Sequence, residues 1–157
     1  MDIKTERAVE AALLAHADKD GALLEILHHV QGALGYIPAA AVPPIGAALN
    51  LSRAEVQGVI GFYHDYRTEP AGETVLQVCR AEACKAMGVQ QLEAHIHQRL
   101  GIHYHETTPD GRYTLEPVYC LGNCACTPSL RIGDTVHARV TPERFDELVP
   151  LAAGVEE

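Results

Sequence analysis

Three of the five cysteines in this 157-residue sequence lie in Tyr119-Cys120-Leu121-Gly122-Asn123-Cys124-Ala125-Cys126-Thr127-Pro128. The other two lie upstream, at Cys84 and at Cys79, which ends the run Val75-Leu76-Gln77-Val78. Four residues separate Cys79 from Cys84, and three separate Cys120 from Cys124. Two short cysteine loops far apart in the sequence must meet in space to share one site. Four thiolates complete either two sulfide-bridged irons or one tetrahedral zinc.

The width of the two loops favours iron and sulfide over zinc. Structural zinc sites pair cysteines about two to four residues apart, most often about two. A two-iron cluster is broader than a single ion, so wider loops suit it. Gly122 allows backbone N–H groups to approach the sulfides closely. On spacing alone, zinc and a set of disulfides or unrelated buried thiols remain open.

At these residues the chain resembles the thioredoxin-like [2Fe-2S] ferredoxins. The pattern is Cys79-x4-Cys84, a gap of 35 residues, and then Cys120-Leu-Gly-x-Cys124. Upstream, Gly35-Tyr36-Ile37-Pro38 and residues 56–63 are similar to the helical N-terminal region of that family. The family includes the small iron–sulfur subunit of the NADH-oxidising module of complex I. Its relatives serve NAD-reducing hydrogenases and NAD-dependent formate dehydrogenases.

The resemblance implies one [2Fe-2S] cluster and an electron-transfer role without catalysis by this chain alone. It also implies a larger partner subunit that carries FMN, a [4Fe-4S] cluster and the NAD(H) site. The implied ligands are Cys79, Cys84, Cys120 and Cys124, with Gly122 and Cys126 in the environment of the cluster.

Two further features resemble the gamma subunit of molybdenum-dependent, NAD-linked formate dehydrogenase. They are Cys126 directly after Cys124-Ala125, and the run Phe-Tyr-His-Asp-Tyr-Arg at residues 62–67. Many complex I members have a small residue at the Cys126 position and Thr at the Gly61 position. We therefore expect a molybdenum-containing catalytic subunit in the complete complex, which interconverts formate plus NAD⁺ with CO₂ plus NADH. The equivalent subunit of complex I or of an NAD-reducing hydrogenase is the alternative.

Composition and charge exclude several classes of partner. The sequence is 47% hydrophobic and has 12 Lys and Arg against 21 Asp and Glu, a net charge of −9. This charge disfavours binding to nucleic acid or to an anionic membrane surface. No apolar run approaches the roughly 18 residues that a membrane span needs. The N-terminal residues lack the charged region followed by an apolar region that is typical of a signal peptide. Five cysteines in an unexported chain indicate metal or redox chemistry, so we expect a cytoplasmic protein.

Residues 1–70 are expected to form an N-terminal helical domain. Apolar periodicity predicts helices over residues 5–17, 23–34 and around 45–49, with Asp20 as the cap of the second and Gly35 as its end. The capping box Ser52-Arg53-Ala54-Glu55 predicts a fourth helix. Residues 45–56 resemble a helix-turn-helix motif. A DNA-binding helix-turn-helix needs basic residues beside its recognition helix, and these are lacking here, so we interpret the segment as two helices that pack together.

Three aromatic residues fall within five positions: Phe62, Tyr63 and Tyr66. They are interpreted either as packing residues, in the core or between domains, or as a contact patch for a partner subunit.

Residues 71–157 are expected to form the second domain, after the linker Glu69-Pro70-Ala71-Gly72. Strands are predicted over residues 74–78, 102–107, 112–119, 130–132 and 135–138, and a helix over residues 89–100. A last helix is predicted from Pro142, capped by Thr141, to about Leu151. The order β-α-β-β-β-β-α is compatible with a thioredoxin-like mixed sheet at whose end both cysteine loops meet. The expected fold class is α+β, an N-terminal helical bundle followed by a thioredoxin-like [2Fe-2S] domain.

Two other classes remain open. A zinc-stabilised structural adaptor would use the same four cysteines, whereas a thiol–disulfide oxidoreductase would need a Cys-x-x-Cys at a helix N-terminus, which the sequence lacks. The absence of a Cys-x-His pair disfavours a Rieske arrangement. Among the nine histidines, His103 and His105 are predicted to share one face of a strand.

Overall fold

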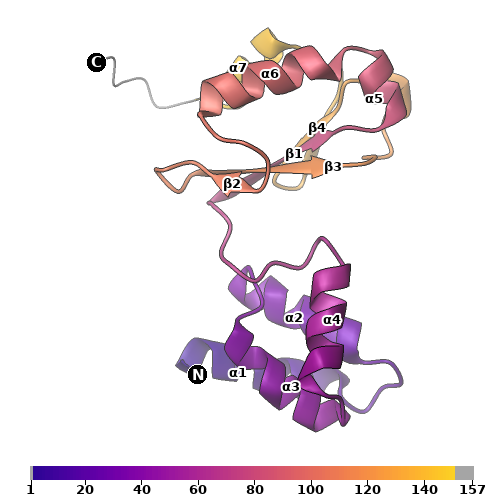
Figure 1. Cartoon of the computed structure of the whole chain (residues 1–157), viewed down its shortest axis with the longest axis vertical. Helices are drawn as coiled ribbons and strands as arrows, with labels where there is room; N and C mark the ends of the chain where they lie inside the picture. Colours follow the sequence, from indigo (N-terminus) through magenta and orange to yellow (C-terminus); the bar gives the residue numbers. More distant parts are fainter. Residues whose placement is uncertain (1, 151–157) are drawn as a thin grey trace. The chain divides into compact units, whose positions relative to one another are not determined.

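The computed structural model describes residues 2–150. Within them the chain divides into two compact units, with the boundary between Pro70 and Ala71 (Figure 1). Each unit has its own buried hydrophobic core. The first unit contains α1 Ile3–His16, α2 Leu23–Leu34, the 3-10 helix η1 Ala39–Ala41, α3 Val42–Leu49 and α4 Arg53–Phe62. The second contains β1 Thr74–Cys79, α5 Glu82–Ala86, α6 Val89–Leu100, β2 Glu106–Thr107, β3 Tyr113–Val118, the 3-10 helix η2 Cys124–Cys126, β4 Leu130–Ile132, β5 Thr135–His137 and α7 Pro142–Leu148.

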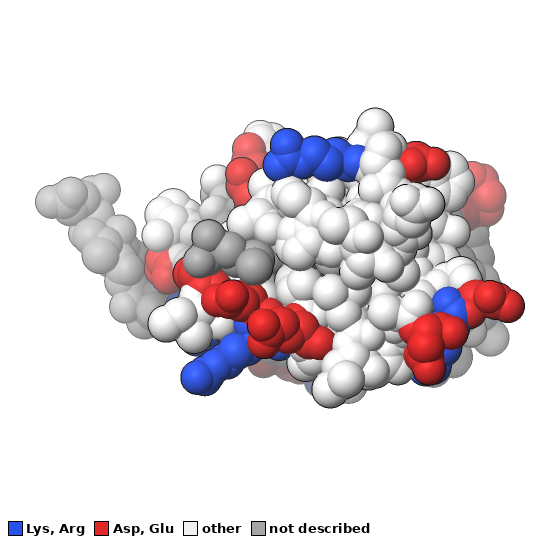
Figure 2. Space-filling view, turned by 90° about the horizontal axis from the view of Figure 1, so that it is seen from below, with Lys and Arg blue, Asp and Glu red and all other residues white. Residues whose placement is uncertain are grey.

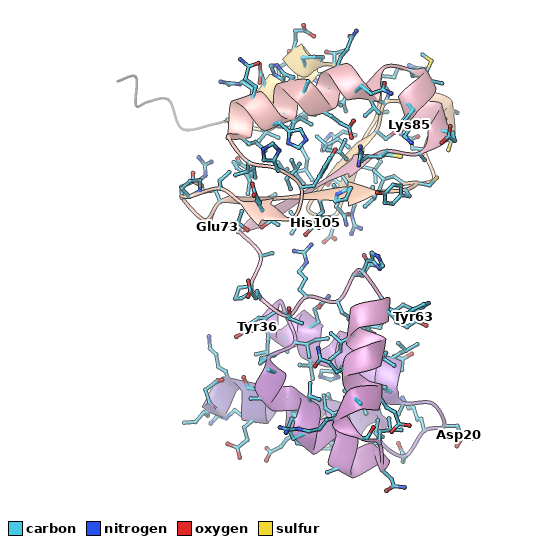
Figure 3. The ribbon with its side chains drawn as sticks, in the orientation of Figure 1. Asp20, Tyr36, Tyr63, Glu73, Lys85 and His105 are labelled. Atoms are coloured by element: carbon cyan, nitrogen blue, oxygen red, sulfur yellow. The ribbon has the colours of Figure 1, made fainter. Side chains whose placement is uncertain are left out.

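The ends of the N-terminal helices follow local capping chemistry, with one correction to the sequence prediction. Gly35 ends α2 in the left-handed conformation at φ 83°, as predicted. Asp20 does not cap this helix: Ala22 occupies the N-cap position, and no side chain caps it there. Asp20 lies in the turn between α1 and α2, two residues before the cap (Figure 3). A carboxylate at that position is too early to accept the first free N–H groups of the helix.

The predicted capping box begins α4. The Ser52 hydroxyl accepts the Glu55 N–H at 3.2 Å, and the Glu55 carboxylate accepts the Ser52 N–H at 2.8 Å. Gly46 lets α3 approach the chain that enters α4, because a Cβ at Gly46 would lie 2.8 Å from the Leu51 carbonyl oxygen. This close contact supports the interpretation of residues 45–56 as a packing unit.

The second unit is a five-stranded mixed sheet with the order β2-β3-β1-β4-β5. The central strand β1 runs parallel to β3 and antiparallel to β4, and β2 and β5 add antiparallel edges. Helices α6 and α7 lie on one side of the sheet (Figure 1). The apolar stripe predicted for α6 is buried in this core: Val89, Leu92, Ile96 and Leu100. The α+β fold class and the thioredoxin-like sheet are thus as predicted.

Three details of the second unit differ from the prediction. The strand predicted over residues 102–107 is reduced to Glu106–Thr107, because His97 Nδ1 bonds the Ile102 carbonyl at 2.9 Å and residues 103–106 close a turn. His103 and His105 therefore do not share a strand face. Helix α5 was not predicted. The last helix begins at Pro142 with Thr141 as its cap but ends at Leu148, and Leu151 lies outside the described residues.

No helix within residues 2–150 combines the length and the apolar character needed to cross a membrane. On the face shown in Figure 2, uncharged side chains fill the centre and charged side chains lie around the edge. Both acidic and basic side chains contribute to this edge.

Candidate metal centre

The two cysteine loops begin at the same edge of the sheet. Cys79 is the last residue of β1 and is aligned with Val118, the last residue of the parallel neighbour β3. Cys120 follows β3 by two residues. Since the carboxyl ends of parallel strands meet at one edge, the chain delivers both loops to one place, as the sequence predicted.

The first pair of thiols is buried. Cys79 and Cys84 are each 2% exposed, and the short helix α5 turns Cys84 back toward the end of β1. Figure 3 marks the position of α5 by Lys85, the residue after Cys84. Burial, followed by a hydrogen bond with Cys79, raises the pKa of the free Cys84 thiol to about 11. A metal bound here must displace these protons, since thiolates are the ligands.

The second pair is exposed and already has the spacing of two ligands on one metal atom. The sulfurs of Cys120 and Cys124 lie 3.7 Å apart. Two sulfurs held tetrahedrally at about 2.3 Å from one ion lie about 3.8 Å apart. The hydrogen bond with Cys120 is the largest cause that raises the pKa of Cys124. Gly122, at φ 72°, turns the loop so that its N–H donates to the Cys120 sulfur at 3.3 Å.

The two pairs face each other. Cys84 interacts electrostatically with both Cys79 and Cys124, and Cys124 interacts with both Cys120 and Cys79. Within residues 2–150, no three His, Cys, Asp or Glu side chains are arranged around the position of a single ion. A [2Fe-2S] cluster takes two thiolates per iron, so two facing pairs of soft sulfur donors suit that group.

Ser129 connects the two loops, and nothing in the sequence pointed to it beyond its position after Pro128. The Cys79 N–H donates to the Ser129 carbonyl at 3.1 Å, and the Ser129 N–H donates to the Cys84 sulfur, which lowers the pKa of that thiol. The Ser129 hydroxyl accepts from the Asn123 amide at 3.1 Å. Ser129 is 1% exposed, so these bonds are shielded from water.

Cys126 is the fifth cysteine and lies in the same 3-10 helix as Cys124. It is half-buried in η2, and its backbone is held at both sides: its N–H donates to the Asn123 carbonyl at 3.0 Å, and its carbonyl accepts the Arg139 N–H at 2.9 Å. These bonds fix the backbone of Cys126 directly after the loop that carries Cys120 and Cys124.

The aromatic segment of the first unit divides into exposed and buried members. Phe62 is 74% exposed and Tyr63 is 44% exposed, with the two rings 5.1 Å apart in an edge-to-face arrangement. Tyr63 projects outward from the end of α4 (Figure 3). Tyr66 is 8% exposed, and its hydroxyl donates to the Leu24 carbonyl at 3.1 Å. Tyr66 therefore packs within the core of its own unit, whereas Phe62 and Tyr63 are exposed to solvent.

Comparison with known proteins identifies the same pattern across most of the chain. A family model described as thioredoxin-like [2Fe-2S] ferredoxin matches residues 9–152. The E subunit of NADH-quinone oxidoreductase from Pseudomonas aeruginosa is 37% identical over 147 residues, which is 93% of this chain and 89% of that protein. The HndA subunit of the NADP-reducing hydrogenase from Solidesulfovibrio fructosivorans is 30% identical, over 83% of this chain and 77% of that protein.

One solved structure contains a chain that is similar to this one in fold. The NAD⁺-reducing [NiFe]-hydrogenase in its H₂-reduced state contains a chain that matches 80% of this one with a TM-score of 0.69 and 25% identity. The match covers 21% of that longer hydrogenase chain, so the similarity concerns one part of it.

Proposed function

Because the chain belongs to the thioredoxin-like [2Fe-2S] ferredoxin family, we propose that it is an electron-transfer subunit in which four cysteines hold the [2Fe-2S] cluster of that family. The proposed ligands are Cys79, Cys84, Cys120 and Cys124. One observation supports this set above all others: two thiol pairs from the ends of parallel strands face each other, and the pair at the surface has its sulfurs 3.7 Å apart. Family membership also favours iron over the zinc adaptor and the thiol–disulfide oxidoreductase.

When bound, the cluster supplies a one-electron donor and acceptor. The residues of this chain ligate it, orient it and limit its contact with water. The buried pair Cys79 and Cys84 anchors it inside the sheet edge, and the exposed pair Cys120 and Cys124 faces the surface. Gly122 presents a backbone N–H to a ligand sulfur. Such N–H donors stabilise negative charge and thereby adjust the reduction potential.

The proposed partner is a larger subunit with FMN, a [4Fe-4S] cluster and the NAD(H) site. The relatives compared above come from an NADH-quinone oxidoreductase and from hydrogenases that reduce NADP or NAD⁺. Transfer of electrons between such a partner and this chain is the role that these names support. We place the complex in the cytoplasm, a reducing compartment where five unpaired thiols are usual.

Within this class we propose a molybdenum-dependent, NAD-linked formate dehydrogenase as the parent complex. The support comes from the sequence, namely Cys126 after Cys124-Ala125 and the aromatic run at residues 62–67. Phe62 is exposed and Cys126 is half-buried, so neither is required by the core of its unit.

Purification of the native complex through this chain tests the assignment. We expect a flavoprotein and a molybdenum subunit to co-purify, with formate-dependent reduction of NAD⁺, and no formate or NADH turnover by this chain alone. Nickel with hydrogen oxidation, or a quinone-reducing membrane complex, would overturn the formate assignment while leaving the electron-transfer role intact. Recovery of an iron-free chain without partners would overturn both.

A further inference from the structure

A charged residue follows the first cysteine directly. Arg80 comes after Cys79, and its N–H donates to the Val118 carbonyl at 2.7 Å. Arg80 is therefore fixed by its backbone between the ends of β1 and β3, the two strands that lead into the cysteine loops. None of the sequence patterns that point to the cluster includes this residue.

The Arg80 side chain is held in a network from three segments. Its Nε lies 2.5 Å from Oε1 of Glu93 on α6, and its guanidinium carbon lies 5.1 Å from the centre of the Tyr104 ring. The Tyr104 hydroxyl donates to the same Glu93 oxygen at 2.7 Å. The Arg80 Nε–H has no well-aligned hydrogen-bond acceptor, so its contact with Glu93 is an ion pair held by charge and by stacking on Tyr104.

The network is partly shielded from water and contains one cation and one anion. The Glu93 side chain is 12% exposed and that of Arg80 is 36% exposed. Burial, followed by the hydrogen bond with Glu93, raises the pKa of Tyr104, so the phenol is neutral and donates. Salt screens such a partly buried pair less than it screens surface charges.

We propose that Arg80, positioned by Glu93 and Tyr104, sets the reduction potential of the cluster whose ligand Cys79 it directly follows in the chain. This inference rests on the ligand set proposed above. Reduction adds one negative charge, so a fixed cation next to a ligand stabilises the reduced form more than the oxidised form and raises the potential. Loss of the cation also leaves the charge of the Glu93 carboxylate uncompensated, although Tyr104 still donates to it, and this negative charge acts in the same direction.

The test is a redox titration of the full-length, iron-loaded chain, followed by absorbance and EPR. In Arg80→Gln we expect the reduced-to-oxidised ratio at a fixed potential to fall about tenfold, which is about 59 mV for one electron. Arg80→Lys should restore most of the wild-type value, because it keeps the charge. Glu93→Gln should shift the potential upward, and Arg80→Gln with Glu93→Gln should return it toward wild type.

Arg99→Gln is the matched control. Arg99 also forms an arginine–carboxylate pair, with Asp146 at 2.9 Å, but it lies six residues beyond Glu93 on the same helix, about 9 Å along the axis. The Arg99→Gln substitution removes the same charge as Arg80→Gln and should leave the reduction potential nearly unchanged.

Equal potentials for Arg80→Gln and Arg99→Gln, with iron retained in both, would overturn the inference and leave the proposed function standing. If Arg80→Gln loses its iron, the inference is tested by the reduction potential of Glu93→Gln. A Glu93→Gln potential equal to that of wild type would then overturn the inference. Absence of iron and sulfide from the wild-type chain would instead overturn the proposed ligand set.

Discussion

Cys126 is the cysteine that the proposed ligand set leaves over. It is two residues from Cys124, and its distance in sequence alone does not exclude it as a ligand. In the structure its backbone bonds to Asn123 and Arg139, and its thiol is half-buried. Two roles fit this position. Cys126 packs as a small apolar side chain beside the site, or its S–H group donates a weak hydrogen bond that adjusts the reduction potential.

We expect Cys126→Ala to keep the complete cluster, because four other thiols already face one another. Iron and sulfide analysis of the purified variant checks this, with circular dichroism to establish folding. A potential within a few millivolts of wild type indicates packing, and a shift of tens of millivolts indicates tuning. A folded, colourless Cys126→Ala protein would show that the fourth ligand is wrongly assigned.

Ser129→Ala should loosen the second cysteine loop without removing a ligand. The variant loses the bond from Asn123 to the Ser129 hydroxyl and the long 3.5 Å bond from that hydroxyl to the Cys126 carbonyl. It keeps the backbone bonds to both cysteines of the first loop. One such bond contributes about 1 kcal/mol, so we expect iron release to a chelator to be about fivefold faster. The control is Thr135→Ala on the exposed strand β5. Equal rates of iron release in the two variants would show that the Ser129 hydroxyl does not stabilise the second cysteine loop.

At the scale of helices and strands, periodicity and capping chemistry predicted most elements, and the failures have local causes. The apolar face of α6 was predicted correctly, because burial of one helix face requires apolar residues at regular spacing in the sequence. The capping box of α4 was predicted correctly, because its pair of hydrogen bonds requires specific residue types three positions apart. Residues 102–107 alternate like a strand, but the Tyr104 hydroxyl bonds to Glu93 on α6 instead of facing a sheet neighbour. Helix α5 is five residues long, too short for periodicity to reveal.

The contact between α3 and α4 is tested by a pair of glycines. Gly46→Ala places a Cβ 2.8 Å from the Leu51 carbonyl oxygen, a backbone atom, so we expect a loss of about 1–3 kcal/mol in the free energy of unfolding. Gly58→Ala on the exposed side of α4 meets nothing within 4 Å and should gain about 0.5–1 kcal/mol. Denaturant midpoints of the two full-length variants check both signs. A Gly46→Ala protein as stable as wild type would contradict the packing described for this pair.

At the scale of the whole molecule, the proposed association with a flavoprotein subunit would involve the exposed surface of the chain. The chain is acidic, with a net charge of −9, and it displays an exposed aromatic pair, Phe62 and Tyr63. The spacing of the cysteines and the family resemblance together led to the prediction of four thiols as one ligand set, and metal analysis of the protein tests it. The sequence did not predict Ser129, Arg80 or Glu93, because their contacts arise only when β1, α6 and the second loop come together.

Phe62→Ala combined with Tyr63→Ala should weaken association with the flavoprotein subunit. An aromatic pair that becomes a buried hot spot of an interface contributes about 2 kcal/mol or more in total, so we expect at least about a 30-fold rise in Kd. Leu14→Ala, at a 91% exposed position on α1, is the control. Co-purification or surface binding with the native partner measures the effect. Unchanged affinity in the double variant would assign the contact to another surface, and the cluster content should be unaffected in either case.

The most direct test of the central claim is metal and sulfide analysis of the anaerobically purified wild-type chain, with EPR after reduction. If Cys79, Cys84, Cys120 and Cys124 hold a [2Fe-2S] cluster, each chain contains about two irons and about two acid-labile sulfides, and reduction gives the signal of a spin-one-half pair. Replacement of any one of these four by Ala should abolish or greatly destabilise the cluster. One zinc per chain without iron, or a full cluster after loss of one of the four thiols, would contradict the account.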